Sequence, residues 1–283
     1  MHKSVGKIVS PRWLSLILLG LSAPLALAQQ PAPQATPAPA RDVHARVTET
    51  PIDASIKDDA AVDQMLAVYS PKVRALDVVI GKLKGELRKG GAGSGSLGNF
   101  VADGMRAEAS VKLGKHVDLA LMNGGGLRRQ TIAEGDLRAR DIFELLPFEN
   151  ALVTLDLTGE QILKLLGVIV TSREAQSGAR ITYVIKADKS WQIESARLGD
   201  KAIDPSAMYT IVTIDYLVNV GGERYGILRE GKNPKALGIT LRDAMMEYLK
   251  SETAAGRDIK PNLDGRFFLD RANSVISGEA PPK

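Results

Sequence analysis

Residues 117–128 read VDLALMNGGGLR, an apolar run followed by three successive glycines and an arginine. The run from Val117 to Met122 is typical of a short buried strand. Each glycine costs roughly 0.5–1 kcal/mol relative to alanine, so we expect positive φ or the close approach of a ligand to the backbone. The planar fork of Arg128 suits phosphate or carboxylate, and the amide of Asn123 can donate and accept. A tight turn with a surface arginine explains the same residues.

Helical and extended patterns alternate on both sides of this stretch. Ser96 is the expected N-cap of a helix that ends near Gly114. Thr158 and Gln161 form a capping box ahead of an apolar stripe, and the last helix starts at Thr240. Further helices are expected at 58–70 and 141–146, and further strands at 78–88, 151–157, 180–185, 192–198 and 209–214. Extended segments cluster in the second half, which predicts a single mixed α/β (α+β) domain with a mixed sheet flanked by helices.

The N-terminal residues are typical of a secretory signal rather than of folded structure. Residues 1–28 hold Lys3, Lys7 and Arg12, an apolar run, and an A-x-A site. That run is shorter than the roughly 20 residues of a membrane-spanning helix. We therefore expect a periplasmic or secreted protein with no membrane span after signal cleavage. The expected segments are a signal peptide (1–28), a Pro/Ala-rich disordered linker (29–55), one domain (56–277) and a disordered tail (278–283).

Composition excludes several classes of function. The chain has 283 residues, 44% hydrophobic and 25% charged, with no Cys. Disulfides, lipid attachment at cysteine and thiolate metal sites are thereby ruled out. Without the three basic residues of the signal, 34 basic side chains face 33 acidic ones. A balance so close to neutral gives no support to nucleic-acid binding, which needs a clear positive excess.

A series of short motifs follows the order of a known family. They are SLGNF at 96–100, NGGGLR at 123–128, LPFEN at 146–150, LTG at 157–159, SG at 177–178, DP at 204–205, DY at 215–216 and GGERY at 221–225. From about Val78 to Leu269 the chain resembles the C-terminal substrate-binding domain of bacterial 5'-nucleotidases and UDP-sugar hydrolases. That domain grips the nucleotide while a separate N-terminal metallophosphatase domain cleaves the phosphate ester.

The resemblance assigns candidate binding residues to this chain. Phe148 and Tyr216 match the two aromatic residues that sandwich the base, and such stacking is worth roughly 1–3 kcal/mol per contact. On residue type alone, a core position after an apolar run is the more common interpretation of Phe148. The remaining matches are Asn150 and Gly178 at the base pocket, Arg128 at the phosphate, and Asn123, Gly124 and Gly125 at the turn. Arg88 and Lys89 lie near the family's other phosphate-side arginines, and a charged strand face explains them as well.

Two features depart from the family pattern. The family's G-G-D-G-Y, whose Asp holds the ribose hydroxyls, is here GGERY at 221–225. Glu223 can still accept hydrogen bonds, but Arg224 replaces a glycine, and its guanidinium offers a phosphate contact instead. The second departure concerns metals. A two-metal phosphoesterase needs several converging imidazoles and carboxylates, and beyond the signal only His44 and His116 are present.

Three functions are therefore compatible with the sequence. The first is an exported domain that binds a nucleotide or nucleotide sugar and works with a metallophosphatase on a separate chain. The second is a stand-alone nucleotide-binding or scavenging protein, and the third is a hydrolase in its own right. We expect no cofactor and no catalytic residue in this chain, with divalent metals only in a partner metallophosphatase. The histidine count opposes the third function.

Overall fold

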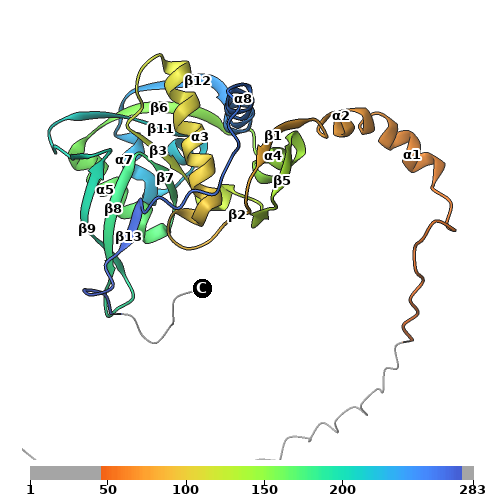
Figure 1. Cartoon of the computed structure of the whole chain (residues 1–283), viewed down its shortest axis with the longest axis horizontal. Helices are drawn as coiled ribbons and strands as arrows, with labels where there is room; N and C mark the ends of the chain where they lie inside the picture. Colours follow the sequence, from red (N-terminus) through yellow and green to blue (C-terminus); the bar gives the residue numbers. More distant parts are fainter. Residues whose placement is uncertain (1–45, 276–283) are drawn as a thin grey trace, which may run out of the picture. The chain divides into compact units, whose positions relative to one another are not determined.

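The computed structural model describes residues 46–275 (Figure 1). The chain divides into two units, residues 1–57 and 58–283. In the first, residues 46–57 are exposed and form neither helix nor strand. The expected signal peptide, the tail at 278–283 and most of the expected linker lie outside the described residues. No helix within the described range is long and apolar enough to cross a membrane.

The second unit holds every helix and strand of the described range. Helices α1 to α8 cover Ala60–Ala67, Ser70–Ala75, Gly95–Leu113, Ala139–Leu145, Gly159–Ser172, Asp215–Asn219, Gly226–Arg229 and Leu241–Ala254. Strands β1 to β13 cover Val79–Leu83, Leu87–Arg88, Leu119–Met122, Thr131–Ile132, Gly135–Arg138, Ala151–Thr158, Ala175–Ser177, Ala179–Ile185, Trp191–Leu198, Lys201–Ala202, Met208–Ile214, Lys232–Thr240 and Phe267–Leu269. Short 3-10 turns, η1 to η3, cover Ala92–Ser94, Gly124–Gly126 and Glu223–Tyr225. The mixed α/β class expected from the sequence is confirmed.

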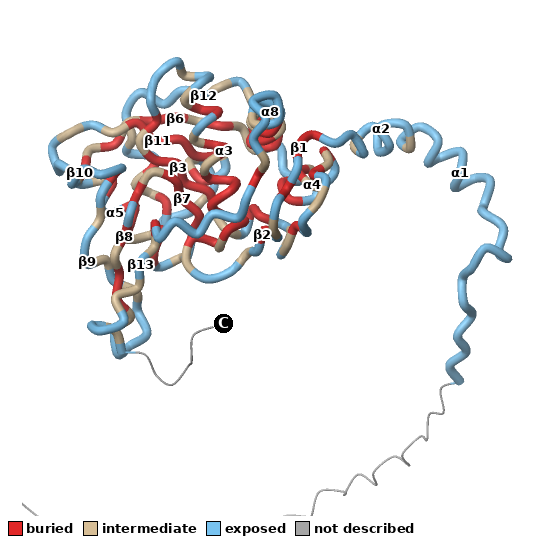
Figure 2. Tube along the Cα trace, viewed as in Figure 1, coloured by how far each residue is buried: buried red, intermediate tan, exposed pale blue. Residues whose placement is uncertain are grey.

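The main sheet has five strands in the order β12-β6-β11-β3-β7. Strands β3 and β11 run parallel, and the other neighbours are antiparallel. All four residues of β3 are buried, as its apolar sequence predicts (Figure 2). Because β3 and β11 are parallel while β6 is antiparallel to β11, the ends of β3 and β11 and the start of β6 meet at one edge of the sheet. A second sheet has the order β10-β9-β8-β13.

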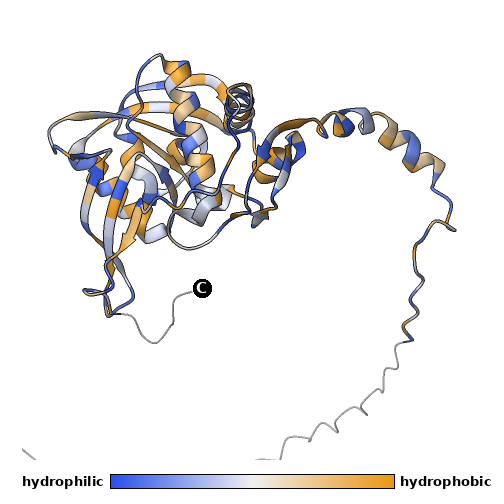
Figure 3. Ribbon diagram, in the orientation of Figure 1, coloured by the Kyte–Doolittle hydropathy of each residue, from blue (hydrophilic) through white to orange (hydrophobic). Residues whose placement is uncertain are grey.

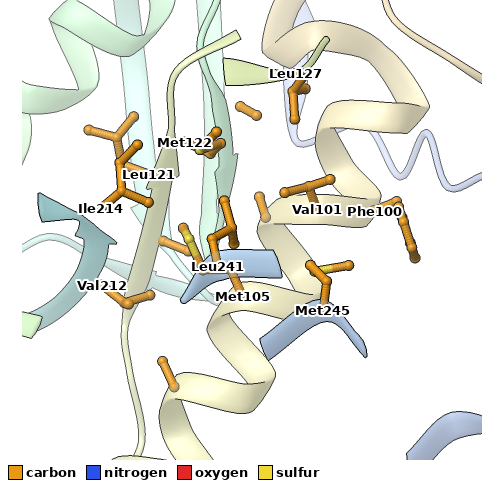
Figure 4. Packing of buried hydrophobic residues seen from close by; sticks show 14 of the residues in the cluster. Phe100, Val101, Met105, Leu121, Met122, Leu127, Val212, Ile214, Leu241 and Met245 are labelled. Atoms are coloured by element: carbon orange, nitrogen blue, oxygen red, sulfur yellow. The ribbon is translucent and has the colours of Figure 1, made fainter. Parts of the chain in front are cut away.

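The core joins helices α3 and α8 to the main sheet. Figure 4 shows Val101 and Met105 of α3 and Met245 of α8 on one side of β3, and Leu121 of β3 beside Ile214 on its other side. Full burial of each such side chain contributes about 1.5–3 kcal/mol. A Cβ at Gly104 would lie 2.6 Å from the Met245 sulfur, so the glycine allows the close approach of the two helices. This packing holds β3, and with it the turn that follows, in a fixed position.

Two predicted helix boundaries were wrong. The N-cap of α3 is Ser94, at φ 59°, rather than Ser96. Ser96 lies inside the first turn, where its hydroxyl accepts a hydrogen bond from the Arg88 N–H at 2.9 Å. The helix expected at 58–70 is α1, but it ends at Ala67 rather than at Ser70. A second helix, α2, begins at Ser70, because proline at 71 suits a first helical turn. Figure 3 shows apolar residues on both helices, and neither helix has a buried residue.

The strand expected at 78–88 is interrupted. It forms β1 and β2, separated by a turn in which Gly85 has φ 100°. The predicted alternation still holds, since Leu83 and Leu87 are buried while Lys82 and Arg88 are exposed. The interruption arises because the two pieces pair with different partners, β1 with β5 and β2 with β4.

The predicted capping box at the start of α5 is present. The Thr158 hydroxyl accepts from the Gln161 N–H at 3.3 Å, and the Gln161 side chain accepts from the Thr158 N–H at 2.9 Å. We expect Thr158→Ala to lower the free energy of unfolding by about 1 kcal/mol in urea titrations. The control is Thr171→Ala, whose hydroxyl bonds only the Gly167 carbonyl of the same helix. Equal losses in the two variants would show that the box adds nothing.

Candidate functional site

A surface slot lies at the sheet edge where β3 and β11 end and β6 begins. It encloses about 350 Å³. Its lining residues are Asn123, Gly125, Gly126, Arg128, Phe148, Asn150 and Tyr216. They come from the turn after β3, the loop between α4 and β6, and the first turn of α6. Residues more than 90 positions apart in the sequence thus meet at one cavity because the sheet topology brings these three chain segments together.

Both aromatic residues of the slot are open to solvent. Phe148 is 47% exposed and Tyr216 is 46% exposed. The interpretation of Phe148 as a core residue is therefore wrong, although the two leucines before Pro147 are buried. Helix α4 ends at Leu145, and the chain then carries Phe148 outward in a loop. Two exposed aromatic rings, one on a loop and one on the first turn of α6, line the same cavity and can stack on a planar ligand.

Asp215 links the start of α6, which carries Tyr216, to the end of the loop that carries Phe148. Its Oδ1 accepts hydrogen bonds from the Tyr216 N–H at 2.8 Å and from the Ala151 N–H at 3.1 Å. Ala151 directly follows Asn150 on the loop that carries Phe148. The carboxylate therefore fixes the start of α6 against the start of β6.

Arg128 lies at the slot beside Phe148. Its backbone N–H donates to the Leu145 carbonyl at 2.9 Å, which fixes the turn against the end of α4. One Nη1–H donates to the Gly125 carbonyl at 3.3 Å. The guanidinium carbon is 5.8 Å from the centroid of the Phe148 ring, within cation–π range. The exposed guanidinium is thus held where it can meet an anionic group next to a stacked ring.

The glycine triplet is needed for a different reason from the one expected. None of Gly124, Gly125 and Gly126 adopts positive φ. A Cβ at Gly124 would lie 2.6 Å from the Ser94 hydroxyl, and one at Gly126 would overlap the Met122 methyl. Gly125 is exposed and lines the slot. Crowding from within the protein therefore requires two of the three glycines.

Glu174 fixes the glycine turn and was not found from the sequence. Only 6% of it is exposed. Its carboxylate accepts from the Gly124 N–H at 2.5 Å and from the Tyr225 hydroxyl at 2.5 Å. Burial, together with this bond, raises the pKa of Tyr225 well above its usual value. The available signal was a single acid, Glu174, placed between helix α5 and the buried strand β7.

Three of the predicted site residues do not line the slot. Gly124 borders a neighbouring cavity of about 360 Å³, which also contains Lys89 and Arg173. Gly178 lies where β7 passes the start of β3, and its φ of 114° is needed because a Cβ would overlap the Asp118 carbonyl. Since the slot lies at the other end of β3, the structure does not bring Gly178 to it. Glu223 is exposed in η3 and is not among the residues that line the slot.

The possible phosphate contacts Arg88, Lys89 and Arg224 do not line the slot. Arg88 pairs with Glu86 at 2.8 Å, as a charged strand face predicts. The Lys89 Nζ donates to the Leu127 carbonyl at 2.9 Å. Arg224 lies at a separate groove beside α5 rather than at the slot. Among residues 46–275, no group of three or more His, Cys, Asp or Glu side chains is placed to hold a metal ion.

The fold and the slot define a mixed α/β domain with an aromatic-lined cavity at one edge of its main sheet. The family model for the 5'-nucleotidase C-terminal domain matches residues 78–230. The chain therefore belongs to the 5'-nucleotidase C-terminal domain family, as its motifs indicate.

Individual relatives are similar over most of this chain. It is 29% identical over 232 residues to the trifunctional nucleotide phosphoesterase protein YfkN of Bacillus subtilis (strain 168), covering 78% of this chain and 15% of that protein. It is 27% identical over 216 residues to protein UshA of Escherichia coli (strain K12), covering 74% and 37%. A crystal structure of a 5'-nucleotidase precursor from Thermus thermophilus superposes with a TM-score of 0.63 at 27% identity, covering 74% and 43%. The chain spans less than half the length of each.

Proposed function

We propose that the slot binds a nucleotide or nucleotide sugar, with the base between Phe148 and Tyr216 and a phosphate at Arg128. One observation carries the proposal: two half-exposed aromatic rings and an exposed guanidinium line the same cavity. Stacking supplies affinity for any base, because each base has a π-face. The arginine fork adds preference for an anionic tail.

Two amide side chains complete the proposed site. Asn150 lines the slot beside Phe148, where it can hydrogen-bond the edge of a base. Asn123 also lines the slot, where its amide group can donate and accept hydrogen bonds.

We propose that the bound nucleotide is presented to a metallophosphatase on a separate chain, which supplies the divalent metals. The family membership and the names of the relatives, among them a nucleotide phosphoesterase, support phosphate-ester hydrolysis as the context. The pattern of residues 1–28 supports export, so the partner would be periplasmic or secreted. The test is phosphate release from AMP with Mn²⁺ or Zn²⁺. We expect none from this chain alone, and metal-dependent turnover by the purified chain would make it a hydrolase instead.

Binding is tested by calorimetry with AMP, adenosine and UDP-glucose. We expect saturable binding of all three at a single site. Heats no larger than those of dilution for every ligand would contradict the proposed function. If the chain binds these ligands, but no exported metallophosphatase of the same cell hydrolyses them when mixed with it, the chain is a stand-alone binding protein.

Replacing Arg128 should separate phosphate from base recognition. We expect Arg128→Ala to weaken AMP binding about tenfold or more, because a hydrogen bond to a charged group is worth roughly 1.5–3 kcal/mol. Adenosine should lose much less, since it carries no phosphate. Arg129→Ala is the matched control, because Arg129 pairs with Asp141 and Glu144 at 2.9 and 3.0 Å and does not line the slot. Equal losses for AMP and adenosine would remove Arg128 from phosphate recognition.

A further inference from the structure

Arg242 holds the chain on both sides of Phe148. It is the second residue of α8 and is 7% exposed. One Nη donates to the Pro147 carbonyl at 3.5 Å, and the other donates to the Glu149 carboxylate. These are the residues immediately before and after Phe148. The planar fork can bond both at once, which a single ammonium group cannot do with the same geometry.

Arg242, Pro147 and Glu149 together form a clamp around Phe148. Three further contacts hold Arg242 and the two ends of the loop that carries Phe148. The Arg242 guanidinium carbon is 4.2 Å from the centroid of the Phe143 ring on α4, so a second helix braces the arginine. The Leu241 N–H donates to the Asn150 carbonyl at 2.8 Å, and the Arg128 N–H donates to the Leu145 carbonyl at 2.9 Å. These backbone bonds hold the two ends of the loop. Its centre, which carries the exposed ring, is held by Arg242.

We propose that Arg242 is a positioning residue: by clamping Pro147 and Glu149 it fixes the direction of Phe148 and so sets the width of the aromatic slot. The effect of Arg242 on ligand affinity depends on the proposed function, in which the slot binds a nucleotide. Arg242 does not line the slot and would touch no ligand. Its role is to restrict Phe148 before a ligand binds, so that the ring loses less conformational entropy when a base stacks on it.

The clamp can be removed with little harm to the fold. The Glu149 side chain is 75% exposed, so it returns to water when its partner is lost. The Nε of Arg242 is buried without a partner among the described residues, and a methionine of similar length removes that polar atom. Arg242→Met therefore separates positioning from stability. Arg257→Met is the matched control, because Arg257 pairs with Glu252 at 2.7 Å at the other end of α8.

The first readout needs no ligand. In amide hydrogen exchange we follow the Leu146 and Ala151 N–H groups, which are hydrogen-bonded at the two ends of the loop. We expect both to exchange about tenfold faster in Arg242→Met than in the parent protein, with the rest of α8 and of the main sheet unchanged. Arg257→Met should leave the exchange of both groups unaltered. Unchanged exchange at Leu146 and Ala151 in Arg242→Met would overturn the proposal, whether or not the slot binds nucleotides.

The second readout is a double-mutant cycle on AMP affinity. We expect Arg242→Met to weaken AMP and adenosine equally, by about three- to tenfold, and Arg242→Lys to fall between it and the parent. In the Phe148→Ala background, Arg242→Met should have no further effect. An undiminished loss in that background would mean that Arg242 does not act through Phe148. If the parent binds no nucleotide, the proposed function fails, and the exchange measurement alone decides whether the clamp exists.

Discussion

Phe148→Ala is expected to weaken AMP binding by about 1–3 kcal/mol, roughly 5- to 150-fold, because the base loses one of its two stacking partners. The loss should be nearly the same for adenosine and UDP-glucose, since stacking is indifferent to the phosphate and tolerant of the base. Stability should change little, because the ring is half exposed in the free protein. Calorimetry gives the affinities, and urea titration gives the free energy of unfolding.

Matched variants make this result specific to the slot. Phe268→Ala removes an equally large ring that is 60% exposed on β13 and does not line the cavity, so AMP affinity should be unchanged. Tyr216→Phe keeps the second ring and should bind normally, whereas Tyr216→Ala should lose affinity as Phe148→Ala does. If Phe148→Ala and Phe268→Ala behave alike, the two rings do not form a base-binding slot.

Arg266→Met is expected to produce the largest loss of stability, about 3 kcal/mol. The Arg266 side chain is buried and forms a network linking β13 to α3. It donates to both oxygens of Asp103 at 2.8 Å, to Asp264 at 2.9 Å and to the Gln176 carbonyl at 3.0 Å. Its removal leaves two partly buried carboxylates without their counter-ion. Urea titration should show the loss, and Arg257→Met, whose pair is more exposed, should lose less than about 1 kcal/mol.

The ion pair between Arg266 and Asp264 also predicts that stability depends on pH. Burial raises the pKa of Asp264, but the hydrogen bond and charge of Arg266 outweigh burial, so the net pKa lies below its usual value. A carboxyl group with a lowered pKa stabilises the fold above its unfolded pKa, and that contribution is lost as pH falls through the folded value. The difference in stability between the parent and Arg266→Met should therefore shrink as the pH falls from about 5 through the ordinary Asp pKa of about 4 and below it. A difference that stays constant over this range would exclude the ion pair as its source.

Local patterns predicted the elements whose signals lie within the sequence. The capping box of Thr158 and Gln161, the buried strand expected at 117–122 and the helix expected to end near Gly114 needed only neighbouring residues. Strand β12 gave no such signal, because Lys232, Pro234 and Lys235 are typical of a loop. It is an edge strand, mostly exposed, and it is defined by its pairing with β6. Its existence depends on a distant partner strand, which no local pattern reveals.

The candidate site divides in the same way. The motifs named Asn123, Arg128, Phe148, Asn150 and Tyr216, and the structure places them on one cavity. The residues that hold them were missed, because their roles come from long-range contacts. Glu174 reaches the glycine turn across 50 positions, and Arg242 reaches the Phe148 loop across 93. Gly178 shows the converse: a motif can match while the position lies at the other end of a strand.

The most direct measurement is a crystal structure of this protein with AMP. We expect the adenine ring between Phe148 and Tyr216, in contact with both, and the phosphate hydrogen-bonded to the guanidinium of Arg128. Density for adenine anywhere outside the slot, or for phosphate at Arg128 with the two rings facing only solvent, would contradict this assignment of the cavity.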